Sequence, residues 1–192
     1  MRVFIGLDFD MNLKENLFAI QGAIKDNSIK GSWVALPNFH LTLKFLGNIE
    51  EEKIHQIDGI LQDVALNSSP IALSLDRLGY FNRTNNEYRV IWIGLKGEIE
   101  KLNNIYNKIE LEMERIGFPM EKRSFTPHIT LGRRVKTNLS FDQMKEIVDG
   151  KLNYDFLLDN LVLMKSEEVR RKRVYTPIIS CTLGNNYEKG HR

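Results

Sequence analysis

The chain has 192 residues, of which 42% are hydrophobic and 27% are charged, as in an ordinary globular protein. This length suits one large domain or two closely packed lobes. A net charge of +2 is too small to predict nucleic-acid binding from overall charge, so an anionic partner would need a local basic patch. The single cysteine excludes an internal disulfide and, with no apolar run of membrane-spanning or signal-peptide type, predicts a cytoplasmic protein with no membrane contact.

Taken in chain order, the hydrophobic patterns predict an alternation of strands and helices. Apolar runs predict strands at about residues 2–9, 40–46, 71–81, 88–95, 128–133, 154–165 and 173–183. Helical spacing of apolar residues predicts helices that begin after Asp10, at Glu50–Glu52, at Glu98 and after Ser140. The polar turn 82–86 predicts a hairpin, the segment 166–172 predicts a charged loop, and the tail 184–192 predicts a frayed end.

Two of the predicted strands begin with nearly the same four residues, H-L-T-L at His40 and H-I-T-L at His128. The chain contains four histidines, and two of them stand in this pattern, so the repetition is a motif rather than coincidence. Each copy is followed by a helix and then by two strands at similar offsets. This order predicts an internal duplication into two lobes, which face each other across a cleft and contribute one H-x-T-x strand each.

Strand geometry determines what the two motifs offer chemically. Side chains alternate along a strand, so His40 and Thr42 project from one face of the first strand, and His128 and Thr130 do the same in the second. Imidazoles titrate near neutrality, so one ring can accept a proton while its partner donates one. Threonine hydroxyls donate hydrogen bonds to phosphate oxygens without adding charge. The set predicts acid/base cleavage of a phosphodiester with no metal ion and no cofactor.

Other kinds of site fit the sequence less well. A lone histidine in a strand is more often structural than catalytic, but the repeated context reverses that expectation. The sequence contains no zinc-ligand spacing, no His-Asp dipeptide, no P-loop and no G-x-G-x-x-G. Cys181 lies in the last predicted strand with no histidine near it in sequence, so a buried structural thiol is expected. We expect His55 on the surface of a helix and His191 in the tail.

Beyond the motifs, the chain resembles the 2H phosphoesterases, specifically their RNA 2',3'-cyclic phosphodiesterase branch, also called 2'-5' RNA ligase-like or LigT-like. The segments that carry the resemblance are 2–7, 33–47, 123–133, 163–166 and Tyr175. The resemblance implies a single α+β domain over residues 1–192, made of two pseudo-symmetric lobes. Each lobe would hold an antiparallel sheet with flanking helices beside a central cleft.

The resemblance also implies an activity and its residues. The substrate would be an RNA end or a small nucleotide with a 2',3'-cyclic phosphate, hydrolysed to a 2'-phosphate by a monomeric enzyme, with weak 2'-5' ligation as the reverse reaction. His40 and His128 would be the catalytic pair, and Thr42 and Thr130 would bind the phosphate. By similarity His128 activates water and His40 protonates the leaving 3'-oxygen, but the residues alone do not distinguish acid from base.

Arg133 is a further phosphate-binding residue that the resemblance implies. It lies five residues after His128, so regular alternation points it to the opposite face unless a bulge near Gly132 turns it back. The same alternation places Phe45 and Phe125 opposite the histidines, which favours core packing over base stacking. Several basic residues offer contacts to an RNA backbone, although such charged runs are more commonly just solvated. These residues are Arg170, Arg171, Lys172, Arg173, Arg123, Arg134 and Lys136.

Two other functions stay open at this point. One is a nucleotide-binding or RNA-binding module of the same fold without turnover, although a pure binder has no need for two titrating groups. The other is a phosphodiesterase that acts on a different small cyclic phosphate. A hydrolysis assay run beside a nucleotide-binding assay separates the first alternative from the enzyme.

Overall fold

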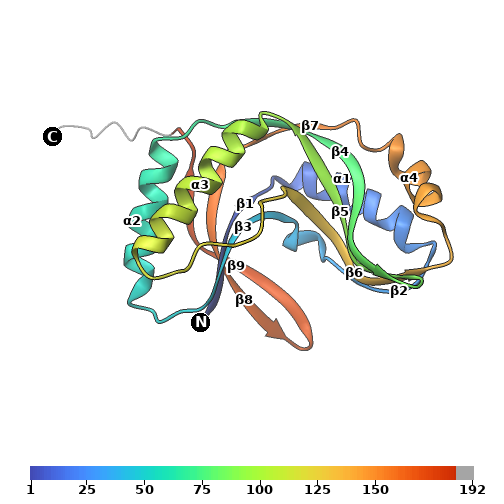
Figure 1. The fold of residues 1–192 in the computed structure, drawn as a ribbon, viewed down its shortest axis with the longest axis horizontal. Coiled ribbons are helices and arrows are strands. Elements are labelled where there is room, and N and C mark those ends of the chain that lie inside the picture. The colour runs from blue at the N-terminus through green and yellow to red at the C-terminus, as the bar shows by residue number, and fades with distance from the viewer. Residues whose placement is uncertain (185–192) are drawn as a thin grey trace.

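The computed structural model describes residues 1–184 and has an α+β fold in which two antiparallel sheets are flanked by helices (Figure 1). The predicted fold class is therefore confirmed. The strands are β1 (Arg2–Asp8), β2 (Ser28–Trp33), β3 (His40–Asn48), β4 (Ile71–Thr84), β5 (Glu87–Gly97), β6 (His128–Thr137), β7 (Asp155–Leu158), β8 (Asn160–Val169) and β9 (Lys172–Thr182). The helices are α1 (Met11–Lys25), η1 (Leu36–Asn38), α2 (Lys53–Leu66), α3 (Ile99–Arg115) and α4 (Phe141–Asp149). The predicted frayed tail and His191 lie outside the described residues.

The two sheets each contain one of the H-x-T strands. The first sheet has the strand order β3-β1-β8-β9, and the second has the order β2-β6-β5-β4-β7. Helices α2 and α3 pack together beside the first sheet, while α1 and α4 pack together beside the second (Figure 1). Among residues 1–184 no helix is long and apolar enough to cross a membrane.

The strands that follow each motif do not stay in the same sheet as that motif. Strands β4 and β5 come after β3 in the chain but lie in the sheet of β6, and β8 and β9 come after β6 but lie in the sheet of β3. The expectation that each half of the chain forms its own lobe is therefore wrong. The two halves exchange strands, although each sheet still holds one motif.

Local sequence signals account for the helix ends that the patterns predicted. Asp10 caps α1, because its side chain accepts a hydrogen bond from the backbone N–H of Leu13 at 2.8 Å. Ser140 and Gln143 form the predicted capping box of α4. The glutamates at 50–52 were expected in the first turn of a helix, but α2 begins after them at Lys53, with Glu52 as its N-cap residue.

Three further differences from the predicted elements occur near the sheet edges. The stretch 154–165 is two strands, because the chain leaves the second sheet after β7 and enters the first sheet at β8. The segment 166–172 is part of the β8–β9 hairpin rather than a loop, with cross-strand pairs up to Val169 and Lys172. Strand β2 was not predicted, because its sequence S-I-K-G-S-W is short, polar and largely exposed at a sheet edge.

The main hydrophobic core includes Leu41 and Leu43 of β3 and Ile129 and Leu131 of β6, as alternation predicted. A second, smaller cluster of Phe4, Val162 and Met164, with Tyr175 packed against it, covers the other face of the first sheet. His40 lies on this second face, because it pairs with Asp8, which shares a face of β1 with Gly6 and Phe4.

A buried ion pair joins β3 to α3 and to the segment that leads to β6. The ammonium group of Lys44 donates to both carboxylate oxygens of Glu110 at 2.8 Å and to the carbonyl of Pro119 at 2.8 Å. Glu110 also accepts a hydrogen bond from the backbone N–H of Glu121. Both charged side chains are almost completely buried, at 4% and 2% exposed, so this network ties the 119–121 segment to the motif strand.

Candidate active site

His40 is held in one orientation by the turn that precedes β3. Pro37 stands in η1, where its fixed φ suits a tight helical turn, and the chain then presents the carbonyl of Asn38 to His40 Nδ1 at 2.7 Å. Because a carbonyl oxygen only accepts, Nδ1 carries the hydrogen and the other ring nitrogen, Nε2, has the lone pair. Nε2 lies 2.8 Å from the hydroxyl of Thr42, which donates to it.

The surroundings of His40 are aromatic on two sides. The ring of Phe4 lies beneath it at 4.6 Å between centroids, and the ring of Tyr175 meets it edge-on at 5.2 Å. Burial lowers the pKa of His40 from 6.5 to about 4, although the Asn38 carbonyl and the Asp8 carboxylate oppose this shift. The positive charge of Lys14, whose ammonium group pairs with Asp8 at 2.7 Å, lowers the same pKa further. His40 is therefore neutral near pH 7.

His128 is held in the second sheet by the same kind of backbone contact. Its Nδ1 donates to the carbonyl of Thr126 at 2.8 Å, so Nε2 again has the lone pair. The ring of Phe81 meets it edge-on at 4.9 Å, and the indole of Trp92 lies at 6.1 Å. Burial lowers the pKa of His128, and the hydrogen bond to Thr126 opposes that shift. This histidine is also biased towards the neutral form.

A β-bulge follows the threonine of the first motif. Thr42 and Lys44 pair with two consecutive residues of β1, so Leu43 is the extra residue in β3. An extra residue shifts the alternation by one position. Phe45 therefore returns to the face that carries His40 and Thr42.

The prediction that Phe45 packs in the core is consequently wrong. Its side chain is 64% exposed, and its ring lies 5.8 Å from Phe4, the same residue that supports His40. Phe125, by contrast, is packed as predicted, stacked flat on Tyr106 with 4.0 Å between ring centroids. An exposed aromatic ring on the histidine face is thus a site feature that simple alternation concealed.

The second motif has a bulge at the equivalent position. Thr130 and Gly132 pair with two consecutive residues of β5, so Leu131 is the extra residue in β6. Arg133 therefore lies on the face of His128 and Thr130, where regular alternation alone would not place it. In position along its strand, Arg133 is the counterpart of Phe45.

Residues of α1 and β2 hold the second bulge in place. The side-chain amide of Gln21, which is 1% exposed, donates to the carbonyls of Val34 and Leu131, both at 2.8 Å. Gly132 adopts no left-handed conformation; instead, a Cβ at this position would lie 2.8 Å from the indole of Trp33. The glycine is therefore required by the close approach of Trp33, and the bulge is set by Gln21.

Arg133 connects the two motifs electrostatically. Its guanidinium group lowers the pKa of His40 and also that of His128, so one cation acts on both imidazoles although they belong to different sheets. Strands β3 and β6 are in contact, which places the two histidine-bearing strands side by side. The arrangement brings together two neutral imidazoles, two hydroxyls and one exposed guanidinium, a set suited to binding and cleaving a phosphate diester.

Asn38 is a site residue that the sequence did not reveal. Besides holding His40 through its carbonyl, it donates from its side-chain amide to the carbonyl of Arg173 at 2.8 Å and accepts from the N–H of Tyr175 at 3.3 Å. It thereby fixes β9 next to the first histidine. Its position two residues before the motif, directly after proline, is the signal that could have indicated it.

The remaining candidates lie away from the histidines. Cys181 is buried, and burial raises the pKa of its thiol to about 11, which agrees with a structural role. His55 is exposed on α2, as expected. Residues 1–184 contain no cluster of three or more side chains suited to binding a metal ion. A cavity of about 400 Å³ is lined by α3 and the 120–125 segment, including Tyr106 and Phe125, and by neither histidine.

A two-sheet α+β fold with one H-x-T strand in each sheet is the architecture of the 2H phosphoesterases. The chain belongs to the 2'-5' RNA ligase superfamily, whose family model matches residues 23–170. It is 34% identical over 156 residues to the RNA 2',3'-cyclic phosphodiesterase of Methanocaldococcus jannaschii, covering 81% of this chain and 84% of the relative. The protein of the same name from Methanothermobacter thermautotrophicus is 28% identical over 180 residues, covering 92% and 95%. The crystal structure of Escherichia coli LigT in apo form shares the fold, with a TM-score of 0.76 at 24% identity, covering 96% of this chain and 98% of LigT.

Proposed function

We propose that this protein hydrolyses 2',3'-cyclic phosphates at RNA ends, or on nucleosides, to 2'-phosphates, by acid/base catalysis with His40 and His128. The observation that carries the proposal is the pair of imidazoles on contacting strands, each with Nδ1 bonded to a carbonyl and Nε2 available for proton transfer. Two relatives with the name RNA 2',3'-cyclic phosphodiesterase support the substrate class.

In the proposed reaction, water attacks phosphorus in line with the 3'-oxygen. A new P–O bond forms to the water oxygen and the P–O3' bond breaks, which leaves a 2'-phosphate and a 3'-hydroxyl. His128 Nε2 takes the proton of the attacking water, and His40 Nε2 delivers a proton to the leaving 3'-oxygen. The same sequence, with the 5'-hydroxyl of a second RNA attacking in place of water, forms a P–O5' bond, breaks the P–O3' bond and so joins two RNA ends through a 2'-5' linkage.

The hydrogen bonds of the two rings support this assignment of base and acid. His40 Nε2 accepts from Thr42, whereas the contacts within residues 1–184 give Nε2 of His128 no such partner. A lone pair that is not already hydrogen-bonded is better placed to accept a proton from water. His40, whose pKa is about 4 in the ligand-free protein, takes up its proton when the phosphate anion binds beside it.

The remaining site residues bind the anion and the base. We assign Thr42, Thr130 and Arg133 to the phosphate oxygens, with Thr42 turning from His40 to the substrate when it binds. Phe45, exposed on the same face, offers a ring on which a nucleobase can stack. The positive charge of Arg133 also stabilises the negative charge that develops on the phosphate in the transition state.

The test is hydrolysis of a nucleoside 2',3'-cyclic phosphate and of an RNA oligomer with the same end, with and without a chelator. His40→Ala and His128→Ala should each lower kcat by about a hundred to ten thousand times, while His55→Ala, at an exposed histidine, should have no effect. Chromatography of the products should give the 2'-phosphate. Tight binding of an adenosine monophosphate without any turnover would favour a binding module, and a 3'-phosphate product would refute the leaving-group assignment.

We further propose that the protein acts in the cytoplasm as a monomer, and that the chain forms a single domain. The exchange of strands between the two sheets supports one domain, because neither sheet is complete without residues from both halves of the chain. Light scattering during gel filtration measures the oligomeric state, and a dimer mass of twice 22.3 kDa would contradict the proposal.

A further inference from the structure

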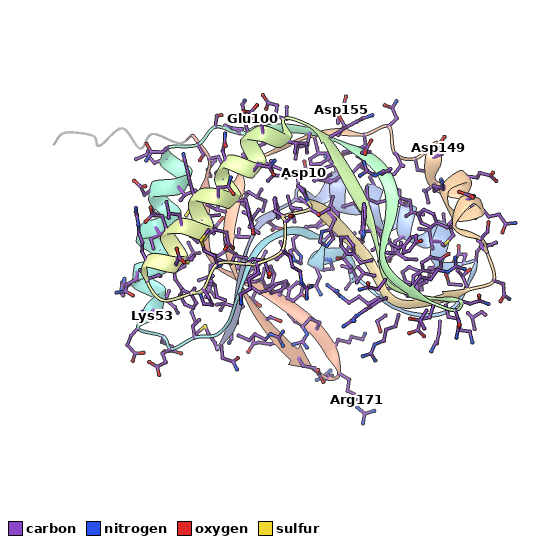
Figure 2. The ribbon with its side chains drawn as sticks, viewed as in Figure 1. Asp10, Lys53, Glu100, Asp149, Asp155 and Arg171 are labelled. Carbon is purple, nitrogen blue, oxygen red and sulfur yellow. The ribbon has the colours of Figure 1, made fainter. Side chains whose placement is uncertain are left out.

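The β8–β9 hairpin projects from the body of the protein, with Arg171 at its tip (Figure 2). Its strands pair from Asn160 and Thr182 up to Val169 and Lys172, so Arg170 and Arg171 alone form the turn. Figure 1 shows that the outer half of the hairpin extends beyond the other strands of both sheets. The side chains near the tip therefore face solvent, and this part of the hairpin adds little to the core.

The backbone of the turn is unusual for the residues it contains. Arg170 and Arg171 both adopt left-handed conformations, with φ of 49° and 63°. A two-residue hairpin turn of this kind favours Asn-Gly, because a residue with a larger side chain is strained in the left-handed region. Arginine at both positions is a poor choice for stability, which indicates that the two guanidinium groups are present for another reason.

The charge of the hairpin tip is strongly positive. Residues 165–173 contain five cationic side chains and two carboxylates. Glu167 pairs with Lys165 at 2.8 Å, and Glu168 lies 3.8 Å from Arg173. Within residues 1–184 the ion pairs do not include Arg170, Arg171 or Lys172, all of which are exposed. The tip thus offers three cations that the protein itself does not neutralise.

The base of the hairpin is part of the candidate active site. Tyr175 contacts the ring of His40, and Asn38 binds the backbone of β9 at Arg173 and Tyr175. Tyr175 and Arg173 pair with Ser166 and Glu168, and alternation puts all four on the histidine face of the sheet. A row of groups therefore leads from His40 to the turn, which is four strand residues, or about 13 Å, beyond Tyr175.

We propose that the tip of this hairpin binds the phosphodiester backbone of the RNA upstream of its cyclic end. The inference rests on the proposed function and deepens it, since it makes an RNA chain, rather than a mononucleotide, the better substrate. The contacts are from arginine and lysine to phosphate oxygens, so they are independent of base sequence and weaken with salt. A cyclic mononucleotide is too small to reach the tip from His40.

The test replaces the turn with the sequence that its backbone prefers. The double variant Arg170→Asn/Arg171→Gly keeps the hairpin, removes two charges and should raise the unfolding temperature. A matched control, Lys96→Gln/Lys151→Gln, also removes two exposed charges. Lys96 pairs with Ser74 of β4, and Ser74 pairs on its other side with Asp155. Asp155 lies on the opposite side of the molecule from Arg171 (Figure 2). Substrates are a nucleoside 2',3'-cyclic phosphate and cyclic-ended RNAs of increasing length.

Two lost contacts to a single strand, at a salt slope of about 0.7 each, predict an increase in KM of roughly 25-fold at 0.1 M salt for RNA that reaches the tip. The effect should vanish towards 1 M salt, and kcat/KM for the mononucleotide should stay at the wild-type value. Equal KM for long RNA in wild type and turn variant, or the same loss in the Lys96/Lys151 control, would overturn the inference.

Fluorescence anisotropy with a labelled RNA oligomer separates this inference from the proposed function. If the wild-type protein hydrolyses neither substrate, the proposed function fails, but binding still decides the role of the hairpin. A salt slope that is lower by about 1.4 in the turn variant supports backbone binding. Identical slopes for the two proteins contradict it, whatever the enzymatic result.

Discussion

Replacing His40 should change how the stability of the protein depends on pH. The ring is partly buried over Phe4, and burial lowers its pKa from 6.5 to about 4. As the pH falls, the unfolded chain therefore binds a proton on this side chain before the folded protein does. The stabilisation is complete above pH 6.5 and is lost progressively as the pH falls towards 4. His40→Gln removes the titrating group and keeps a polar side chain of similar length.

The size of the effect follows from the two pKa values. A difference of 6.5 against about 4 corresponds to about 3 kcal/mol when the pH has fallen below both. Between pH 7 and pH 5, where few carboxylates are protonated, the same two values predict a loss of about 2 kcal/mol in the free energy of unfolding. His128 adds a loss of the same sign, because its pKa is also lowered by burial.

Urea denaturation of both proteins at half-unit steps from pH 7 to pH 5 measures this difference. The wild type should lose about 2 kcal/mol more than His40→Gln over this range, with the two m-values equal. All other titrating groups are common to both proteins and cancel in the comparison. Parallel curves would refute the claim that His40 is held neutral by burial.

Further predictions concern neighbouring residues. Because both histidine pKa values are lowered, kcat/KM should reach its maximum below about pH 6, as measured by initial rates at low substrate. Phe45→Ala should raise KM for nucleoside cyclic phosphates by the equivalent of about 1 to 3 kcal/mol, with kcat nearly unchanged. Lys44→Met alone should destabilise the fold by roughly 3 to 5 kcal/mol in urea denaturation, because it leaves Glu110 buried and unpaired, and Glu110→Leu in the same chain should restore part of that loss. Gly6→Ala should lower both stability and turnover, since its Cβ would lie 2.7 Å from the Leu41 carbonyl and 3.6 Å from the His40 ring.

Much of the site could be predicted because the motif is local. Residues that are two positions apart on a strand share a face, so the sequence alone predicts that His40 and Thr42 project from the same side. The burial of Leu41 and Leu43 follows in the same way, since large apolar side chains at the alternate positions require a core. These rules need no knowledge of what lies beside the strand.

The predictions that were wrong concern features that depend on residues far away in the sequence. The bulge that turns Phe45 outward appears only in the pairing of β3 with β1, and the bulge at Leu131 is held by Gln21 from a helix 110 residues earlier. Likewise, nothing in residues 154–165 says that β7 and β8 join different sheets. Apolar runs predict that a segment is buried, but they do not predict which partner buries it.

The exchange of strands between the sheets has a consequence for how the protein folds. Strand β3 pairs with β1, and the other side of β1 is covered by β8, which is made about 160 residues after β1. Strand β6 needs β5 on one side and β2, about 100 residues earlier, on the other. Such distant pairings make folding slow. A ribosome-bound chain that has reached only β5 contains His40 but lacks His128 on β6 and lacks β8 and β9 of the first sheet, so catalytic competence should arise only after the last strands emerge.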